Sequence, residues 1–123
     1  MEGTFDNQEN QAQSMANEAE QFATEISYGV KYVKVSDKLE KSNTVAHINI
    51  TTLENENWCI ELNTQGFLIV SNELDTIDNS TKLNNILNKT NLFETIESLM
   101  FNISPLFCKK FNQMVSDKLS KIN

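Results

Sequence analysis

The chain has 123 residues, a formal net charge of −7 and a hydrophobic fraction of 39%. This length accommodates one domain with one modest core. The negative mean hydropathy of −0.41 indicates a well-solvated surface. An acidic protein repels phosphate backbones, which disfavours direct binding of nucleic acid. No apolar run approaches the roughly 20 residues of a membrane span, and no signal sequence is recognisable, so we expect an intracellular protein, cytoplasmic or also nuclear, without a membrane partner.

The first part of the chain divides into a polar segment and an amphipathic one. Residues 1–13 are rich in glutamine and asparagine, and such a segment buries too little surface to offset the entropy of ordering. We therefore expect a disordered tail over 1–13 and a single domain over 14–123. Apolar residues at helical spacing then predict a first helix over 14–32, with a stripe at Ala19, Phe22, Ala23, Ile26, Val30 and Val33, although Tyr32–Val35 can already be extended.

Three short segments, 45–52, 58–62 and 67–71, have the alternating pattern of β-strands. In the first segment, Ala46, Ile48 and Ile50 alternate with polar residues, among them His47 and Asn49. This period of two predicts one buried face and one solvated face. The connections are short and polar, which favours an antiparallel meander. Residues 72–90 are rich in Asn, Asp, Ser and Thr, and we expect an irregular loop there with at most one helical turn.

Two helices are predicted at the C-terminal end. Asn91 and Glu94 have the spacing of a capping box, which predicts a helix with a buried stripe at Leu92, Phe93, Ile96, Leu99, Met100 and Ile103. Ser104-Pro105 then ends this helix and begins the last one, because serine caps helices well and proline suits the first helical position. The predicted fold is α+β: an N-terminal helix, a small antiparallel β-meander of three to four strands, and two C-terminal helices.

Residues with the potential for catalysis or metal binding have no recognisable arrangement. His47 is the only histidine, and Cys59 and Cys108 lack the spacing of a metal site. We expect neither a metal nor a cofactor, because Gly-rich phosphate loops are also absent. Four carboxylates fall in predicted loops and are interpreted as solvated turn residues: Glu54, Glu56, Asp75 and Asp78. By elimination, an interaction module is favoured over an enzyme.

Four stretches of the sequence together resemble the glycogen synthase kinase 3 interaction protein family. In chain order they are Glu18-Ala19-Glu20, Val45-Ala46-His47-Ile48-Asn49-Ile50, Trp58-Cys59-Ile60-Glu61-Leu62, and Thr95-Ile96-Glu97-Ser98-Leu99 leading to Ile103-Ser104-Pro105. The similarity extends from about Asn17 to Ile122 and looks like the stand-alone form, with a more distant relation to a domain of clustered-mitochondria proteins.

The resemblance implies a non-enzymatic α+β adaptor that binds glycogen synthase kinase 3 through its C-terminal helix and restrains or localises the kinase. By position, Phe111, Val115 and Leu119 match the hydrophobic anchors of the family. Leu119 aligns with the leucine that is most characteristic of these anchors. Val115 is smaller than the leucine usual there. The other apolar residues of this helix, Phe107, Met114 and Ile122, are then expected to face the core, and exposure of the three anchors in the free protein is left open.

Vertebrate members of the family also anchor the regulatory subunit of protein kinase A through the first helix. The corresponding face here is formed by Phe22, Ala23, Ile26, Ser27 and Val30. Ala23 and Ser27 stand where those members place larger aliphatic residues, so we expect this anchoring to be weak or absent, and the stripe to face the core instead. Alternatives to kinase binding are an interaction domain linked to mitochondrial or translation machinery, and a small enzyme built around His47 or Cys59. We expect a monomer.

Overall fold

The computed structural model describes residues 14–122, and the predicted tail at 1–13 lies outside this range. Within it, five antiparallel strands form one sheet in chain order. The strands are β1 (Val30–Val35), β2 (Ala46–Thr52), β3 (Asn57–Asn63), β4 (Gly66–Ser71) and β5 (Leu92–Phe93). The predicted α+β class and the order of its elements are confirmed, with one strand more than the three to four expected.

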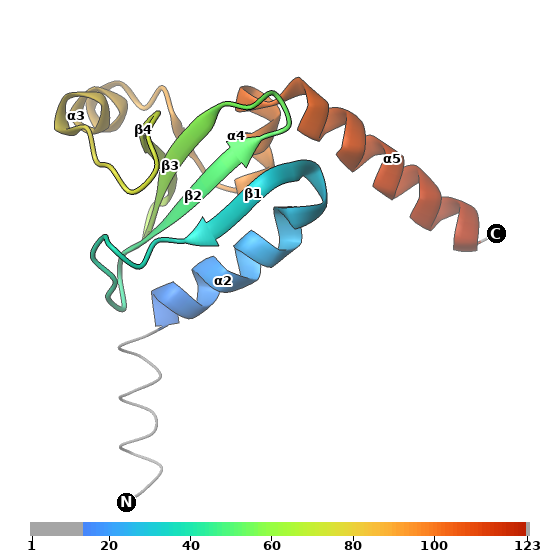
Figure 1. The fold of residues 1–123 in the computed structure, drawn as a ribbon, viewed down its shortest axis with the longest axis horizontal. Helices are drawn as coiled ribbons and strands as arrows, with labels where there is room; N and C mark the ends of the chain where they lie inside the picture. Colours follow the sequence, from blue (N-terminus) through green and yellow to red (C-terminus); the bar gives the residue numbers. More distant parts are fainter. Residues whose placement is uncertain (1–13, 123) are drawn as a thin grey trace, which may run out of the picture.

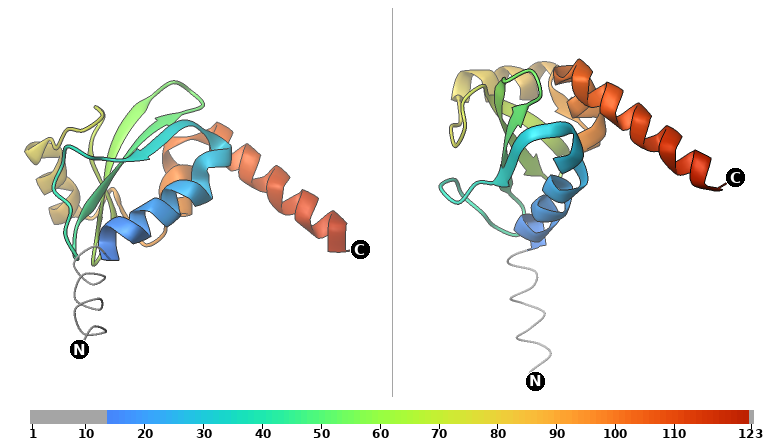
Figure 2. Two further views of the ribbon diagram at one scale, coloured as in Figure 1. Left: turned by 60° about the horizontal axis from the view of Figure 1, so that its bottom comes forward. Right: turned by 45° about the vertical axis from the view of Figure 1, so that its right-hand side comes forward.

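Helices lie on both sides of this sheet. One face is covered by α2 (Ser14–Ile26) and α4 (Ile96–Ile103), the other by α3 (Asn79–Asn88). The last helix, α5 (Pro105–Ile122), leaves the body at one corner and projects away from it (Figure 1). The views in Figure 2 show the same projection from two further directions. The C-terminal helix is therefore an arm with its base on the domain.

The main core lies between the sheet and the α2–α4 layer. Ile48 of β2 pairs with Ile60 of β3, and Ile60 pairs with Ile69 of β4, so these side chains form a row across the sheet. All three are buried in one cluster with Ile26 of α2 and Leu99 of α4. Burial of apolar surface in this layer is the main stabilising contribution.

The first helix ends earlier than predicted. The α2 helix stops at Ile26, a 3-10 turn follows at Ser27–Gly29, and β1 begins at Val30. The extension of the helix to residue 32 is therefore wrong, and Val30 and Val33 lie in a strand. The helix stops because the following residues pair with β2 in the sheet, where Val33 lies opposite Ile50. Pairing with β2 satisfies the backbone hydrogen-bonding groups that a longer helix would otherwise have satisfied.

The second face of the sheet is covered, although the sequence predicted it to be solvated. His47 and Asn49 are 1% and 3% exposed. The alternation itself is correct, because both side chains point away from the main core. Both have polar partners on this side of the sheet. His47 Nε2 lies 3.3 Å from Glu61 Oε1 of the neighbouring strand β3, and Asn49 Nδ2 donates to Asp75 of the covering segment 72–78 at 2.7 Å.

The α3 helix lies in the segment that was predicted to be an irregular loop. Its N-terminus is capped by Asp78, whose carboxylate accepts from the N–H of Ser80 at 3.0 Å and of Thr81 at 3.3 Å. Toward the sheet the helix presents a polar residue, the buried Asn85, which donates to the carbonyl of Ile69 at 2.8 Å. Its apolar residues are exposed instead: Leu83, Ile86 and Leu87. Polar residues inside and apolar residues outside reverse the usual pattern of a surface helix.

The approach to the C-terminal helices differs from the prediction in one detail. Asn91 does not cap α4. The cap is Thr95, whose Oγ1 accepts from the N–H of Ser98 at 3.1 Å. Leu92 and Phe93 form β5 instead, which pairs with the outer edge of β4 and places Phe93 opposite Phe67. The predicted break at Ser104-Pro105 is confirmed, because α4 ends at Ile103 and α5 begins at Pro105.

Candidate functional site

The base of α5 is fixed to the sheet by a turn carboxylate. Ser104 Oγ accepts from the N–H of Phe107 at 3.0 Å, as expected for an N-cap, and donates to Glu54 Oε1 at 2.7 Å. The other oxygen, Glu54 Oε2, accepts from the N–H of Leu106 at 3.0 Å. A carboxylate at a helix N-terminus is also favoured by the helix dipole. The interpretation of Glu54 as a solvated turn residue is therefore wrong, since it joins the β2–β3 turn to α5.

Along α5 the apolar residues change from buried to exposed. Phe107 is fully buried, as predicted, and packs against Tyr28 with ring centroids 5.4 Å apart. It lies so close to the 3-10 turn that a Cβ on Gly29 would be 2.5 Å from Phe107 Cδ2. Met114, also expected in the core, is half-buried. Ile122 lies in the helix, but its side chain is outside the described part of the chain.

The three predicted anchors form one row that starts on the body and runs out along the arm. Phe111 is half-buried, Val115 is 36% exposed and Leu119 is 58% exposed. Their spacing of four residues places them on one side of a helix. Figures 1 and 2 show that the distal part of α5 extends beyond the sheet and the other helices. The row is therefore accessible without detachment of the helix.

The arm is basic, whereas the whole protein is acidic. It carries one acidic residue, Asp117, and four lysines: Lys109, Lys110, Lys118 and Lys121. None of these five side chains makes a hydrogen bond or ion pair within residues 14–122. An exposed apolar row on a helix with unpaired lysines fits an apolar groove on a protein whose surface is not itself basic.

One aromatic residue beside this row was not singled out by the sequence. Phe101 of α4 is 40% exposed, and its ring centroid lies 5.0 Å from that of Phe111, with the planes 74° apart. The sequence carried a signal for it, because Phe101 is an aromatic residue outside the buried stripe predicted for its helix. The contact itself depends on the angle between α4 and α5, which no local pattern specifies.

The residues considered for binding the regulatory subunit of protein kinase A do not form one exposed helical face. Ala23 and Ile26 are buried in the core, and Phe22 packs edge-on against Phe67 with ring centroids 4.9 Å apart. Ser27 belongs to the 3-10 turn and Val30 to β1. The five positions are thus distributed over three elements, with two of them turned inward.

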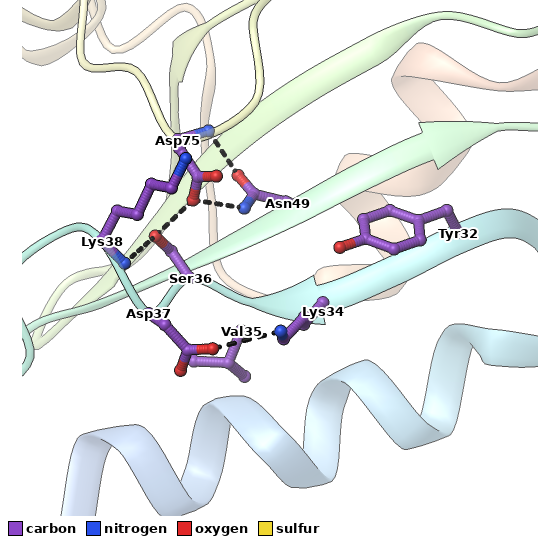
Figure 3. Close-up of a pocket in the computed structure, with 8 residues that line it drawn as sticks. All are labelled: Tyr32, Lys34, Val35, Ser36, Asp37, Lys38, Asn49 and Asp75. Carbon is purple, nitrogen blue, oxygen red and sulfur yellow. Dashed lines mark hydrogen bonds and ion pairs between the residues drawn. The ribbon is translucent and has the colours of Figure 1, made fainter.

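A small pocket of about 100 Å³ lies beside β1, and several of the polar side chains that line it are bonded to one another (Figure 3). Asp75 lies between two side chains that donate to it, Ser36 Oγ at 2.6 Å and Asn49 Nδ2 at 2.7 Å. These hydrogen bonds lower the pKa of Asp75. At the rim, Lys34 and Asp37 form an ion pair of 3.1 Å. The cluster attaches the segment 72–78 to the sheet, so Asp75 is another turn carboxylate with a structural role.

The buried face under α3 contains ionisable groups that are paired. Burial alone would raise the pKa of Glu61, but hydrogen bonds from His47, Lys82 and Asn63 lower it to about 2. Lys82 Nζ is 2.7 Å from Glu61 Oε1, and Asn63 Nδ2 donates to Oε2 at 2.9 Å. Nearby, burial raises the pKa of the Cys59 thiol to about 11, so this cysteine is a poor nucleophile at neutral pH.

No group of three or more His, Cys, Asp or Glu side chains within residues 14–122 is arranged to hold a metal ion. None of the described helices has the combination of length and apolarity that a bilayer span needs.

The fold and the exposed row define the class of this molecule as a small α+β domain with a projecting, amphipathic terminal helix. Residues 15–122 match the family model of the GSKIP domain, and the chain belongs to this family. It is 28% identical over 108 residues to the GSK3B-interacting protein of Homo sapiens, and the aligned region covers 88% of this chain and 73% of the human protein. It is 31% identical over 101 residues to the protein GSKIP homolog of Drosophila melanogaster, covering 82% and 75% of the two chains. The GSK3-beta interaction protein of Gallus gallus is 29% identical over 117 residues, covering 95% of this chain and 79% of the chicken protein.

Proposed function

We propose that this protein is a non-enzymatic adaptor that binds glycogen synthase kinase 3 through the exposed row of α5, Phe111, Val115 and Leu119, and thereby restrains or localises the kinase. The observation that carries the proposal is the exposure of Val115 and Leu119 on a helix that projects from the body. The partner is taken from the relatives, several of which are named for an interaction with this kinase.

The energetics of a helix in a groove agree with this role. Each anchor that becomes fully buried contributes about 1.5–3 kcal/mol, and this gain is offset by the loss of translational and side-chain freedom. Only a small rearrangement is needed, because the helix is already formed and its base is held by Glu54 and Ser104. A helix that is ordered before binding pays less entropy when it docks, which favours micromolar or tighter affinity.

The absence of a catalytic role rests on the environment of the two residues that were considered for one. His47 and Cys59 are 1% and 0% exposed, respectively. A substrate would therefore have to displace α3 or the segment 72–78 to reach either of them. Binding through the arm needs no such opening.

A calorimetric titration of the kinase domain with the full chain tests the proposal. Leu119→Asp places a charge in the row and is expected to weaken binding at least about tenfold, because a buried unpaired charge is costly. The matched control is Leu87→Asp, which introduces the same change at a leucine that is 69% exposed on α3, and should bind as the wild type does. Absence of wild-type binding, or equal binding by Leu119→Asp, would overturn the proposal.

Kinase activity measured at saturating adaptor separates the two consequences of binding. Restraint predicts a lower rate of phosphorylation of a substrate peptide when the adaptor is bound. Localisation alone predicts an unchanged rate with the same affinity.

A further inference from the structure

Phe101 is the one large apolar side chain of α4 that the core leaves out. Four other apolar residues of this short helix are buried: Ile96, Leu99, Met100 and Ile103. Phe101 is 40% exposed, and its ring contacts Phe111 of α5. The exposed part of this aromatic ring is apolar surface that the free protein leaves in contact with solvent.

The ring of Phe101 is in contact with the first anchor of the α5 row. Its centroid is 5.0 Å from that of Phe111 in an edge-to-face arrangement and 6.0 Å from that of the buried Phe107. At 5.0 Å the two rings touch, so a partner surface that closes over the exposed side of Phe111 also reaches Phe101. The row on the arm therefore continues onto the body of the domain.

We propose that the docking surface is composite, formed by Phe101 of α4 together with Phe111, Val115 and Leu119 of α5. This inference rests on the proposed function, and the occupant is the same kinase. The groove of the kinase would be apolar along its whole length. At the end that contacts the body of this domain, it would receive the aromatic ring of Phe101. Aromatic side chains are enriched among the residues that dominate binding energy. Three side chains on one helix also bury much less than the roughly 800 Å² per partner of a standard interface.

Leu106 provides a matched control for Phe101. The two residues lie on either side of the same joint and are similarly exposed, at 42% and 40%. Leu106 precedes Phe111 by five residues, which places it on a different side of α5 from the row. A general effect of removing apolar surface at the joint would appear equally in both variants.

The experiment measures binding of the kinase domain to full-length Phe101→Ala, Phe101→Leu, Leu106→Ala and Leu119→Asp, well below their unfolding temperatures. We expect Phe101→Ala to weaken binding about tenfold, as for a residue that dominates an interface. Phe101→Leu should retain most of the affinity, and Leu106→Ala should stay within about twofold of the wild type. Hydrogen exchange of the α5 amides in the free variants should match the wild type.

The possible outcomes separate this inference from the function on which it rests. Equal binding by Phe101→Ala and wild type, or equal weakening by Leu106→Ala, overturns the composite surface while the effect of Leu119→Asp sustains the proposed function. Weakened binding with faster exchange of α5 in free Phe101→Ala also overturns it, because Phe101 would then act on the helix and not on the kinase. Wild-type protein that does not bind contradicts both.

Discussion

The hydroxyl of Ser104 donates a 2.7 Å hydrogen bond to the carboxylate of Glu54, fifty positions earlier in the chain. The same carboxylate accepts from the N–H of Leu106, and Ser104 in turn caps Phe107. One side chain in the β2–β3 turn thus holds the first turn of α5. The direction in which the arm leaves the sheet is set at this contact and by the packing of Phe107 below it.

Replacing Glu54 by alanine should loosen the base of α5. The change removes two hydrogen bonds and a favourable charge at the helix N-terminus, and we expect a loss of about 1–2 kcal/mol of unfolding free energy. Amide exchange at Leu106 and Phe107 should become faster than in the wild type. Thermal unfolding and exchange measured by NMR check both effects.

Glu56→Ala is the control for this change. Glu56 lies two residues after Glu54 and has the same charge, but its side chain is exposed and makes no bond to α5. Equal effects of the two variants on Phe107 exchange would show that the Glu54 contact does not hold the helix.

The buried carboxylate of Glu61 predicts a dependence of stability on pH. Its folded pKa of about 2 lies below its ordinary value of 4.5, because the hydrogen bonds from His47, Lys82 and Asn63 outweigh the effect of burial. A depressed pKa stabilises the fold above pH 4.5, and this contribution, about 3 kcal/mol, is lost as the pH falls from 4.5 toward 2. Urea unfolding at a series of pH values measures it.

Lys82→Met tests the origin of that dependence. Removal of the ammonium group 2.7 Å from Glu61 should raise the pKa of this carboxyl toward its ordinary value, so that the acid loss of stability is smaller and is complete at a higher pH than in the wild type. Lys89→Met makes the same replacement at an exposed lysine and should leave the profile unchanged. Identical profiles for the two variants would exclude Lys82 as a cause.

Much of the fold was predictable because local patterns and tertiary demands coincide. The alternation of Ile48 and Ile50 with polar residues specifies a strand, and the structure contains it as β2. The pair Ser104-Pro105 specifies the boundary between α4 and α5. In the last helix, Phe107 is buried and Leu119 is exposed. This agrees with the expectation that Phe107 faces the core and is consistent with Leu119 being on the binding side. The contact of Phe101 with Phe111 was not predictable, because it depends on how two helices meet.

The failure at α3 has a specific physical cause. Prediction of a surface helix assumes that its apolar side faces the protein, yet α3 is attached through Asn85 and Lys82 and exposes Leu83 and Leu87. Its inward polar side is matched by polar groups of the sheet, Glu61 and the carbonyl of Ile69. His47 and Asn49 were expected in solvent because they are polar. They are buried because this face also supplies polar partners for them, Glu61 and Asp75.

Two neighbouring asparagines of α3 provide a direct check of this arrangement. Asn85 is buried, donates to Ile69 and accepts from Thr90 and Asn91, so Asn85→Ala should cost about 1–3 kcal/mol by leaving these groups unpaired. Asn84 is exposed, and Asn84→Ala should change the unfolding free energy by less than about 0.5 kcal/mol. Chemical denaturation of both variants measures the difference, and equal stabilities would contradict the inverted orientation of the helix.

Hydrogen–deuterium exchange of the full chain, with and without the kinase domain, tests most directly whether α5 is the binding surface. The distal part of α5 has little support from the body, so its amides should exchange readily in the free protein. On binding, we predict protection from Phe111 to Leu119, with α2 and α3 unchanged. Protection confined to α2 or α3, or a complex in which α5 exchanges as fast as in the free chain, would contradict the account.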